Sequence, residues 1–178
     1  MKKLTLKLTL TAIFAALGLI TFVIEGLLPP LFLPGARLGL SNVFILLAVI
    51  FCGTKYGFSV LIVKTVLGSL FAGNISAAMY SLPSGAIALT IEIILLYFVK
   101  RVSIVSISVT GGVISTVIQN TVFCLVNKTS AYLVYSPYLA LIGALSGAVV
   151  GFTVYLICLK SPDFFIDKKS NTIKENEN

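Results

Sequence analysis

Long stretches of apolar residues, separated by short polar or Pro/Gly-containing breaks, fill residues 1–160. A helix that crosses a bilayer needs about 17–25 mostly apolar residues. Strands of a membrane β-barrel would instead give short segments in which apolar and polar residues alternate. The pattern therefore predicts an all-α integral membrane protein of about six transmembrane helices, over residues 7–28, 36–53, 56–72, 76–98, 102–127 and 132–159.

The breaks between these stretches contain residues that end helices. Pro29 and Pro30 close the first stretch and open a loop, and Gly53 marks a tight turn. We expect residues 1–160 to form one six-helix transmembrane domain. Residues 161–178 turn polar and are predicted to be a short disordered cytoplasmic tail.

Composition and charge agree with a membrane location. The chain is 58% hydrophobic and 11% charged, whereas a soluble domain is about 25% charged. In the six-span arrangement, Arg37 and Lys128 fall on one side of the membrane and most other basic residues on the opposite side. Under the positive-inside rule this asymmetry places both termini in the cytoplasm. We expect a multi-pass protein of the bacterial cytoplasmic (inner) membrane with lipid, not nucleic acid, around it.

Several polar residues fall in the outer half of the predicted helices or in the loops beside them. Polar groups inside a bilayer are costly and need a partner or a function. The sequence predicts that they line an outward-facing pocket for a small molecule, capped by the loop after the first helix; the alternative is that the amides only bridge helices. The candidate substrate-binding residues are Arg37, Asn42, Asn74, Tyr80, Gln119 and Asn120.

Arg37 is the predicted ligand for an anionic or polar group of the substrate, because a guanidinium can bind such a group through two hydrogen bonds. Its alternative role is to anchor the chain at lipid head groups. The orientation of the substrate would be fixed by neutral hydrogen bonds from Asn42, Asn74, Tyr80, Gln119 and Asn120.

Lys64 and Glu92 are the charges expected in the inner half. Counted from the cytoplasmic ends of their helices, both lie about 10–12 Å deep. Equal depth on consecutive helices predicts a buried ion pair, which would lower the cost of burying either charge. The alternative is a coupling-ion or proton site at the Glu92 carboxylate.

Ala12 and Ala16 lie four residues apart on the first helix, so they share one face. Small side chains let helices approach closely in a membrane. This face could receive another subunit, or it could pack against the chain's own helices.

The residue types that are missing argue against autonomous catalysis. The chain has no histidine and only six acidic residues, so the membrane domain offers no clustered carboxylates for magnesium. It contains no GxxxxGK[ST] phosphate loop. We expect no cofactor, no metal site and no catalytic residue.

Two segments carry a family resemblance. Residues 34–42 (PGARLGLSN) and 64–73 (KTVLGSLFAG) resemble signature stretches of bacterial membrane proteins called heptaprenyl diphosphate synthase component I, also known as the Gx transporter family. Gln119 and Asn120 stand where members of that family place histidine, asparagine or glutamine. The resemblance covers most of residues 7–155.

That family in turn is similar to the substrate-binding S-components of energy-coupling factor transporters. The resemblance implies a six-helix protein whose first helix docks a transmembrane coupling subunit, which works with two ATPase subunits. Ala12 and Ala16 match the docking pattern. It also implies a substrate site in the outer half, beneath the loop after the first helix.

These observations lead to one principal function and two alternatives. The principal hypothesis is an S-component-like binding subunit of an uptake transporter. The first alternative is a non-catalytic membrane accessory subunit of heptaprenyl or polyprenyl diphosphate synthase that serves menaquinone formation. The second is an ion-coupled carrier that acts alone and depends on Glu92.

Overall fold

In the computed structural model, which describes residues 2–27, 39–99 and 102–160, the chain is a bundle of helices. These residues form six α-helices and one 3₁₀ helix, with no strand among them: α1 (Lys2–Leu27), α2 (Asn42–Phe51), α3 (Thr54–Phe71), α4 (Ser76–Phe98), α5 (Ile104–Val126), η1 (Ser130–Tyr135) and α6 (Ser136–Lys160). The predicted all-α class is therefore confirmed. The predicted tail, residues 161–178, and the loop that contains Arg37 lie outside the described residues.

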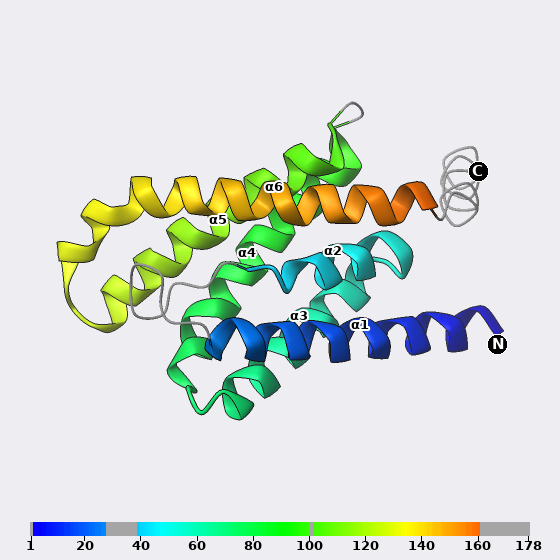
Figure 1. Cartoon of the computed structure of the whole chain (residues 1–178), viewed down its shortest axis with the longest axis horizontal. Helices are drawn as coiled ribbons and strands as arrows, with labels where there is room; N and C mark the ends of the chain where they lie inside the picture. The colour runs from blue at the N-terminus through cyan, green and yellow to red at the C-terminus, as the bar shows by residue number, and fades with distance from the viewer. Residues whose placement is uncertain (1, 28–38, 100–101, 161–178) are drawn as a thin grey trace.

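Four segments are long and apolar enough to cross a membrane, namely Leu4–Gly26, Ser76–Phe98, Ile104–Val126 and Ser130–Lys160. These segments support a membrane protein. Helix α2 is shorter, and α3 is not among the four, so the count of six spans stays a prediction. The first residue of α1 and the last residue of α6 lie at the same end of the bundle (Figure 1).

Helix α2 differs from its prediction. The sequence predicted a helix over 36–53, but the helix begins at Asn42 and has ten residues. Gly39 has a φ of +75°, a left-handed conformation that favours glycine, and the backbone N–H of Asn42 donates to the carbonyl of Gly39. The residues on both sides of this turn are apolar, and hydropathy alone does not distinguish a turn within an apolar segment from a helix.

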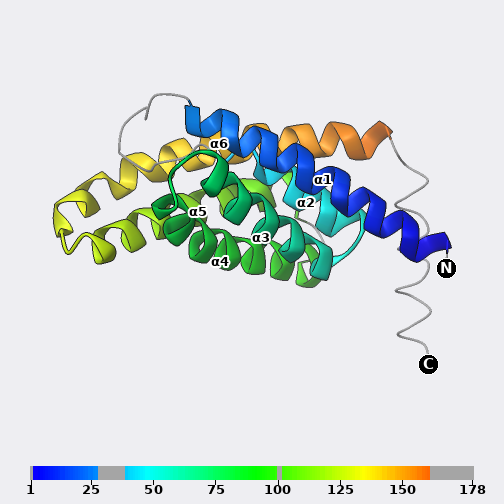
Figure 2. The ribbon, with the colours of Figure 1, turned by 90° about the horizontal axis from the view of Figure 1, so that it is seen from below.

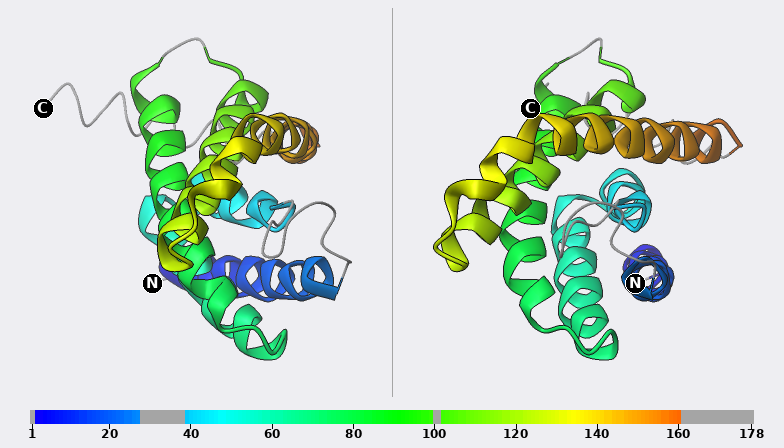
Figure 3. Two further views of the ribbon diagram at one scale, coloured as in Figure 1. Left: turned by 90° about the vertical axis from the view of Figure 1, so that its left-hand side faces the viewer. Right: turned by 60° about the vertical axis from the view of Figure 1, so that its left-hand side comes forward.

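Helix α2 occupies the centre of the bundle. It lies between α1 and α6 (Figures 1 and 3) and packs against both of them and against α3. Most of its residues are buried, which explains why it is apolar all round. Val49 packs with Val60 and Leu61 of α3, and Leu46 packs with Val150 of α6.

The remaining helices form two distinct packings around α2. Helix α1 crosses one side of the bundle and contacts α3 and α2 (Figure 2). Helices α5 and α6 pack against each other along glycines: a Cβ added at Gly112 would lie 2.3 Å from the carbonyl oxygen of Gly143. Only glycine permits this approach of two backbones.

Candidate functional site

Lys64 of α3 is the charged centre of the bundle. It is 3% exposed, and its Nζ donates hydrogen bonds to Ser41 Oγ and Asn42 Oδ1, each at 2.8 Å. Nζ also lies 5.9 Å from the centroid of the Phe22 ring on α1, within the range of a cation–π contact. Three separate segments therefore contribute to the environment of this ammonium group.

Glu25, near the end of α1, holds the turn that precedes α2. Its Oε1 accepts a hydrogen bond from the backbone N–H of Ser41 at 2.8 Å, and its Oε2 accepts from that of Gly39 at 3.2 Å. Ser41 makes no side-chain capping bond to α2, and its hydroxyl accepts from Lys64 instead. The carboxylate thus fixes the backbone of Gly39 and of Ser41, and Ser41 is one of the two residues that accept a hydrogen bond from Lys64.

A cavity of about 30 Å³ lies beside Lys64. Its polar lining comes from α1 to α5 and from the turn before α2, and consists of Glu25, Ser41, Asn42, Lys64, Thr65, Ser81, Ser84, Ser115 and Gln119. One water molecule needs at least about 10–15 Å³, so the cavity admits one or two molecules of that size. A larger ligand would fit only after a neighbouring segment moved.

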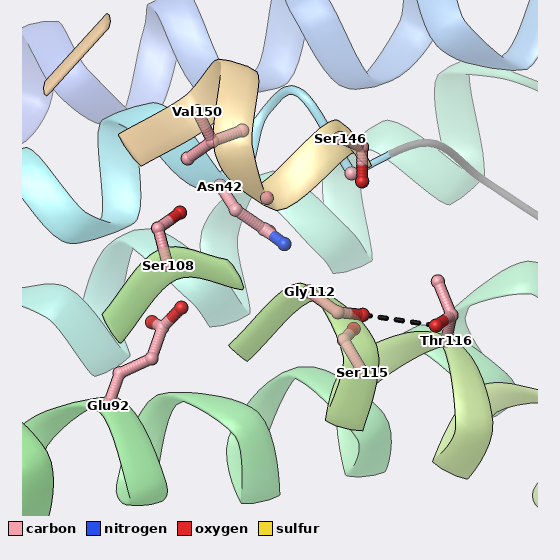
Figure 4. Close-up of a pocket in the computed structure, with 10 residues that line it drawn as sticks. Asn42, Glu92, Ser108, Gly112, Ser115, Thr116, Ser146 and Val150 are labelled. Atoms are coloured by element: carbon pink, nitrogen blue, oxygen red, sulfur yellow. Dashed lines mark hydrogen bonds between the residues drawn. The ribbon is translucent and has the colours of Figure 1, made fainter. Parts of the chain in front are cut away.

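Glu92 is one of the residues that line a second cavity, of about 20 Å³ (Figure 4). Gly39, Asn42 and Ser115 line both cavities, so the two are neighbours. The charge of Lys64 acts on Glu92, but the hydrogen bonds from Nζ described above go to Ser41 and Asn42. A direct ion pair between Lys64 and Glu92 stays a prediction.

The relative depth predicted for Lys64 and Asn42 needs a correction. The sequence placed Lys64 in the inner half and Asn42 in the outer half, yet the two side chains are hydrogen-bonded. Asn42 begins α2 and lies nine residues before its last residue, Phe51, or about 14 Å of helix. Ten residues separate Lys64 from the start of α3, or about 15 Å of helix.

Of the predicted substrate-binding residues, the structure brings Asn42 and Gln119 to the Lys64 cavity. Gln119 Nε2 donates to Ser81 Oγ at 3.3 Å and so joins α5 to α4. Asn42 lines both cavities.

The other predicted residues lie elsewhere. Asn74 is exposed, and its Oδ1 accepts from the backbone N–H of Ala77 at the start of α4. Tyr80 packs edge-to-face on Phe123, with ring centroids 5.4 Å apart. Asn120 Nδ2 donates to the Tyr132 carbonyl at 3.0 Å and to a serine hydroxyl at 2.9 Å. These contacts bridge or cap helices, which was the alternative considered for the amides. Arg37 lies outside the described residues.

The chain was also compared with known proteins. The family model for heptaprenyl diphosphate synthase component I matches residues 14–157. The chain belongs to this family. The comparison with curated proteins and the comparison with solved structures each found no match.

The two segments that suggested the heptaprenyl diphosphate synthase component I family meet in the structure. Ser41 and Asn42 end the first segment, Lys64 begins the second, and the three are joined by hydrogen bonds. Gly68, also in the second segment, lies so close to the Phe22 ring that a Cβ there would collide with it. Both segments therefore help to build the charged centre.

Ala12 and Ala16 line a surface groove between α1 and α3 in this component I family member. The groove measures about 550 Å³, and its other residues include Tyr56, Val63 and Leu67. Both alanines are exposed. The face predicted to dock a partner is thus accessible in the isolated chain, although docking itself stays a prediction.

The chemistry available at these sites is binding. Across residues 2–27, 39–99 and 102–160, no group of three or more His, Cys, Asp or Glu side chains lies close enough to hold a metal ion. Glu25 and Glu92 line different cavities. The arrangement offers one cation, two carboxylates and several neutral hydrogen-bonding groups, which suit recognition of a polar group.

Sequence reasoning missed Glu25 and Ser41 as site residues. Glu25 is an acidic residue at the end of a long apolar run, and that position was a usable signal. Ser41 is 1% exposed, but a single serine in an apolar segment is too common to identify a lysine's partner. The serines of α4 and α5 that line the cavities also stand in apolar segments, and nothing in the sequence marks them as site residues.

Proposed function

We propose that this chain is a non-catalytic membrane subunit that works with a soluble prenyl diphosphate synthase and binds a polar group of a small molecule beside Lys64. The observation that carries this proposal is the family match over residues 14–157. The absence of a carboxylate cluster among the described residues supports a non-catalytic role, because prenyl diphosphate chemistry uses magnesium held by acidic side chains.

The apolar character of a polyprenyl chain gives the partnership a physical reason. A long isoprenoid made by a soluble enzyme belongs in the bilayer, since burial of each CH₂ group contributes about 0.8 kcal/mol. A membrane subunit beside the synthase would provide a site where the product enters the lipid. Lys64 supplies the positive charge that a polar or anionic head group requires, and Arg37 remains the predicted second cation.

The small volume of the Lys64 cavity sets a condition on this function. A diphosphate group is larger than the one or two water molecules that about 30 Å³ can hold. Binding of such a group would require α1 or the turn held by Glu25 to shift. The hydrogen bonds from Gly39 and Ser41 to Glu25 are the contacts that would have to break.

A second candidate is the substrate-binding subunit of an energy-coupling factor type transporter in the bacterial inner membrane. The observation that favours it is the exposed groove lined by Ala12 and Ala16. A helix of a coupling subunit could pack closely on these small side chains. In this function the Lys64 cavity would hold the transported small molecule.

Affinity purification of the tagged full chain from its native membranes, in mild detergent, tests both candidates. Mass spectrometry would identify the proteins and small molecules that remain bound. A soluble prenyl synthase in stoichiometric amount would support the accessory role. A transmembrane coupling subunit with two ATPases, and no synthase, would overturn it in favour of transport.

A pair of variants adds a surface-specific control. Ala12→Leu with Ala16→Leu fills the groove and should abolish capture of a coupling subunit. Thr9→Leu adds similar bulk at an exposed position of α1 outside the groove and should leave capture unchanged. Equal loss in both variants would show that the groove has no special part in docking.

A further inference from the structure

The hairpin formed by α5, η1 and α6 carries a pocket that has no part in the proposed function. This hairpin projects beyond the other helices, at the end of the bundle opposite the first residue of α1 and the last residue of α6 (Figures 1 and 2). The pocket measures about 300 Å³, and its lining includes Thr121, Leu125, Lys128, Thr129, Ser130 and Leu133. None of these residues lines the two cavities or the groove described above, so the pocket is a separate site.

The length of α6 places this pocket near the level of lipid head groups. Helix α6 has 25 residues, or about 38 Å of helix, and a hydrocarbon core is about 30 Å thick. With Lys160 at the predicted cytoplasmic surface and α6 along the membrane normal, its first turn reaches the opposite head-group layer. Tyr135 and Tyr138, which are 52% and 45% exposed, agree with this depth, because tyrosine is enriched where a membrane meets water.

Lys128 has a backbone conformation that glycine usually supplies. It follows Asn127, the C-cap of α5, and its φ is +52°. Its N–H donates to the carbonyl of Leu125 at 3.3 Å, and the next N–H, that of Thr129, donates to the carbonyl of Cys124 at 3.1 Å. These two bonds form a Schellman motif, in which a Cβ at the left-handed residue costs free energy. A lysine at such a strained position indicates a function for its side chain.

The hairpin offers Lys128 no acidic side chain as a partner. The sequence contains no Asp or Glu between Glu92 and Asp163, so α5, η1 and α6 supply none. Lys128 is exposed, and it is the only charged residue among those described that line the pocket. An unbalanced positive charge at this place attracts an anion.

The hydroxyl groups of the pocket differ in where their protons are directed. Thr121 Oγ1 donates to the carbonyl of Val117 at 2.9 Å, and Thr129 Oγ1 donates to that of Asn127 at 3.1 Å. For the Ser130 hydroxyl, no hydrogen bond is found within the described segments, so its proton is available to a ligand. An ammonium group and a free hydroxyl donor suit a phosphate group, whose charged oxygens accept hydrogen bonds.

Apolar side chains lie beside these polar groups. Leu125 and Leu133 line the pocket, and Leu125 is 73% exposed and Val134 79% exposed in the isolated chain. Exposed apolar side chains of this kind suit contact with a membrane. A soluble phosphate would leave them against water, whereas the acyl chains of a lipid would cover them. Phosphate-binding groups next to apolar side chains therefore match the chemistry of a phospholipid.

We propose that this pocket binds an anionic phospholipid of the outer leaflet. Lys128 neutralises the phosphate, Ser130 donates a hydrogen bond to it, and Leu125 and Leu133 contact the start of the acyl chains. A zwitterionic lipid carries its own cation beside the phosphate, whereas an anionic lipid needs one from the protein. The bound lipid holds the tip of the hairpin at the head-group layer, and this role is independent of the proposed function.

The test is titration of the purified full chain, in detergent, with phosphatidylglycerol, with the bound lipid counted by native mass spectrometry. Lys128→Met keeps the length of the side chain and removes its charge, so the Kd of the first bound lipid should become about fivefold weaker. Lys55→Met is the matched control, because it removes the same charge at an exposed position outside the pocket. It should keep the native Kd. Phosphatidylcholine should bind the native chain more weakly than phosphatidylglycerol.

Lys128→Gly separates the side chain of this residue from its backbone conformation. Glycine adopts the left-handed φ without strain, so the Tm in detergent without lipid should rise by about 2–4 °C. The Kd for phosphatidylglycerol should nevertheless weaken about fivefold, as in Lys128→Met. Ser130→Ala removes one hydrogen bond to the phosphate and should weaken the Kd about twofold.

Three outcomes would overturn the proposal. The first is the same Kd for phosphatidylglycerol in the native chain and in Lys128→Met. The second is an equal weakening in Lys55→Met, which would show an effect of net charge alone. The third is glycerol phosphate binding as tightly as phosphatidylglycerol, which would make the pocket a site for a soluble phosphate compound.

Discussion

The two sides of the bundle are held together by different means. Between α5 and α6, the contact is backbone against backbone: a Cβ at Gly112 would lie 2.3 Å from the Gly143 carbonyl oxygen, and one at Gly147 would lie 2.5 Å from that of Ser108. Between α1, α2 and α3, the contact is a hydrogen-bonded network around Lys64. One side therefore tolerates no added volume, and the other tolerates no lost polar partner.

The difference follows from the solvent. Lipid supplies no hydrophobic force between helices, so helices associate through close packing or through buried hydrogen bonds. Close packing of α5 and α6 relies on glycines, and the cavity beside this contact has a volume of only about 20 Å³. The Lys64 network gathers charge at one point and leaves cavities beside it. Binding is thus concentrated where polar contacts hold the structure.

The largest effect is expected for Gly112→Val. The new side chain would collide with the backbone of α6, and overpacking of a tight core costs about 1–3 kcal/mol even where side chains can adjust. Size-exclusion chromatography in detergent should recover little folded protein. Gly18→Ala is the control, since its Cβ would meet only ordinary contacts at 3.5 Å or more. Equal yields of both variants would contradict the described packing of α5 on α6.

Lys64→Met should come next. It keeps the length of the side chain and removes the ammonium group that donates hydrogen bonds to Ser41 and Asn42. Each buried group left without its partner costs about 1–3 kcal/mol. We expect a clear fall in Tm and loss of any ligand retained by the native chain. The exposed Lys55→Met should change neither; an unchanged Tm for Lys64→Met would contradict a structural role for the network.

Glu25→Gln should have a smaller effect, because the amide oxygen can replace one acceptor but not both. The bond from the Gly39 N–H, at 3.2 Å, is the longer of the two and should be lost first. A fall in free energy of unfolding of about 1–2 kcal/mol is expected. Hydrogen exchange at Gly39 and Ser41 should accelerate, while exchange in α5 stays the same. Faster exchange in both places would indicate global destabilisation instead.

Thr65→Val should have the smallest effect. Thr65 Oγ1 is buried and has no hydrogen-bond partner within the described segments. Replacing an unpaired hydroxyl by a methyl group of similar shape removes a desolvation cost. The Tm should stay the same or rise slightly. Ser41→Ala, which removes an acceptor of Lys64, should lower it; the opposite order would contradict the hydrogen bonding described around α3.

Helix positions were largely readable from the sequence, because long apolar runs and their breaks depend on local composition. The observed α4 and α5, Ser76–Phe98 and Ile104–Val126, lie within two residues of the predicted 76–98 and 102–127. The start of α2 was not readable. Its turn at Gly39 is partly buried, and Leu38 and Leu40 continue the apolar pattern across it.

The candidate site was only partly predictable. Asn42 and Asn120 look alike in sequence, since each is an amide in an apolar run. Asn42 lines both cavities, whereas Asn120 ties α5 to η1 and α6. What separates them is the direction of the side chain around the helix, and this depends on how six helices pack. Counting along one chain cannot supply that information.

The shortness of α2 also has an electrical consequence. Ten residues cover about 15 Å, which is about half of a hydrocarbon core about 30 Å thick. A full crossing of the membrane by one elementary charge changes its energy by about 2.3 kcal/mol per 100 mV. With Phe51 at one membrane surface and α2 along the membrane normal, a charged ligand at the level of Asn42 would lie about halfway across that field. Its occupancy at this depth should therefore vary with the membrane potential. The fraction of protein molecules with the ligand bound should differ between an energised cell and a depolarised one.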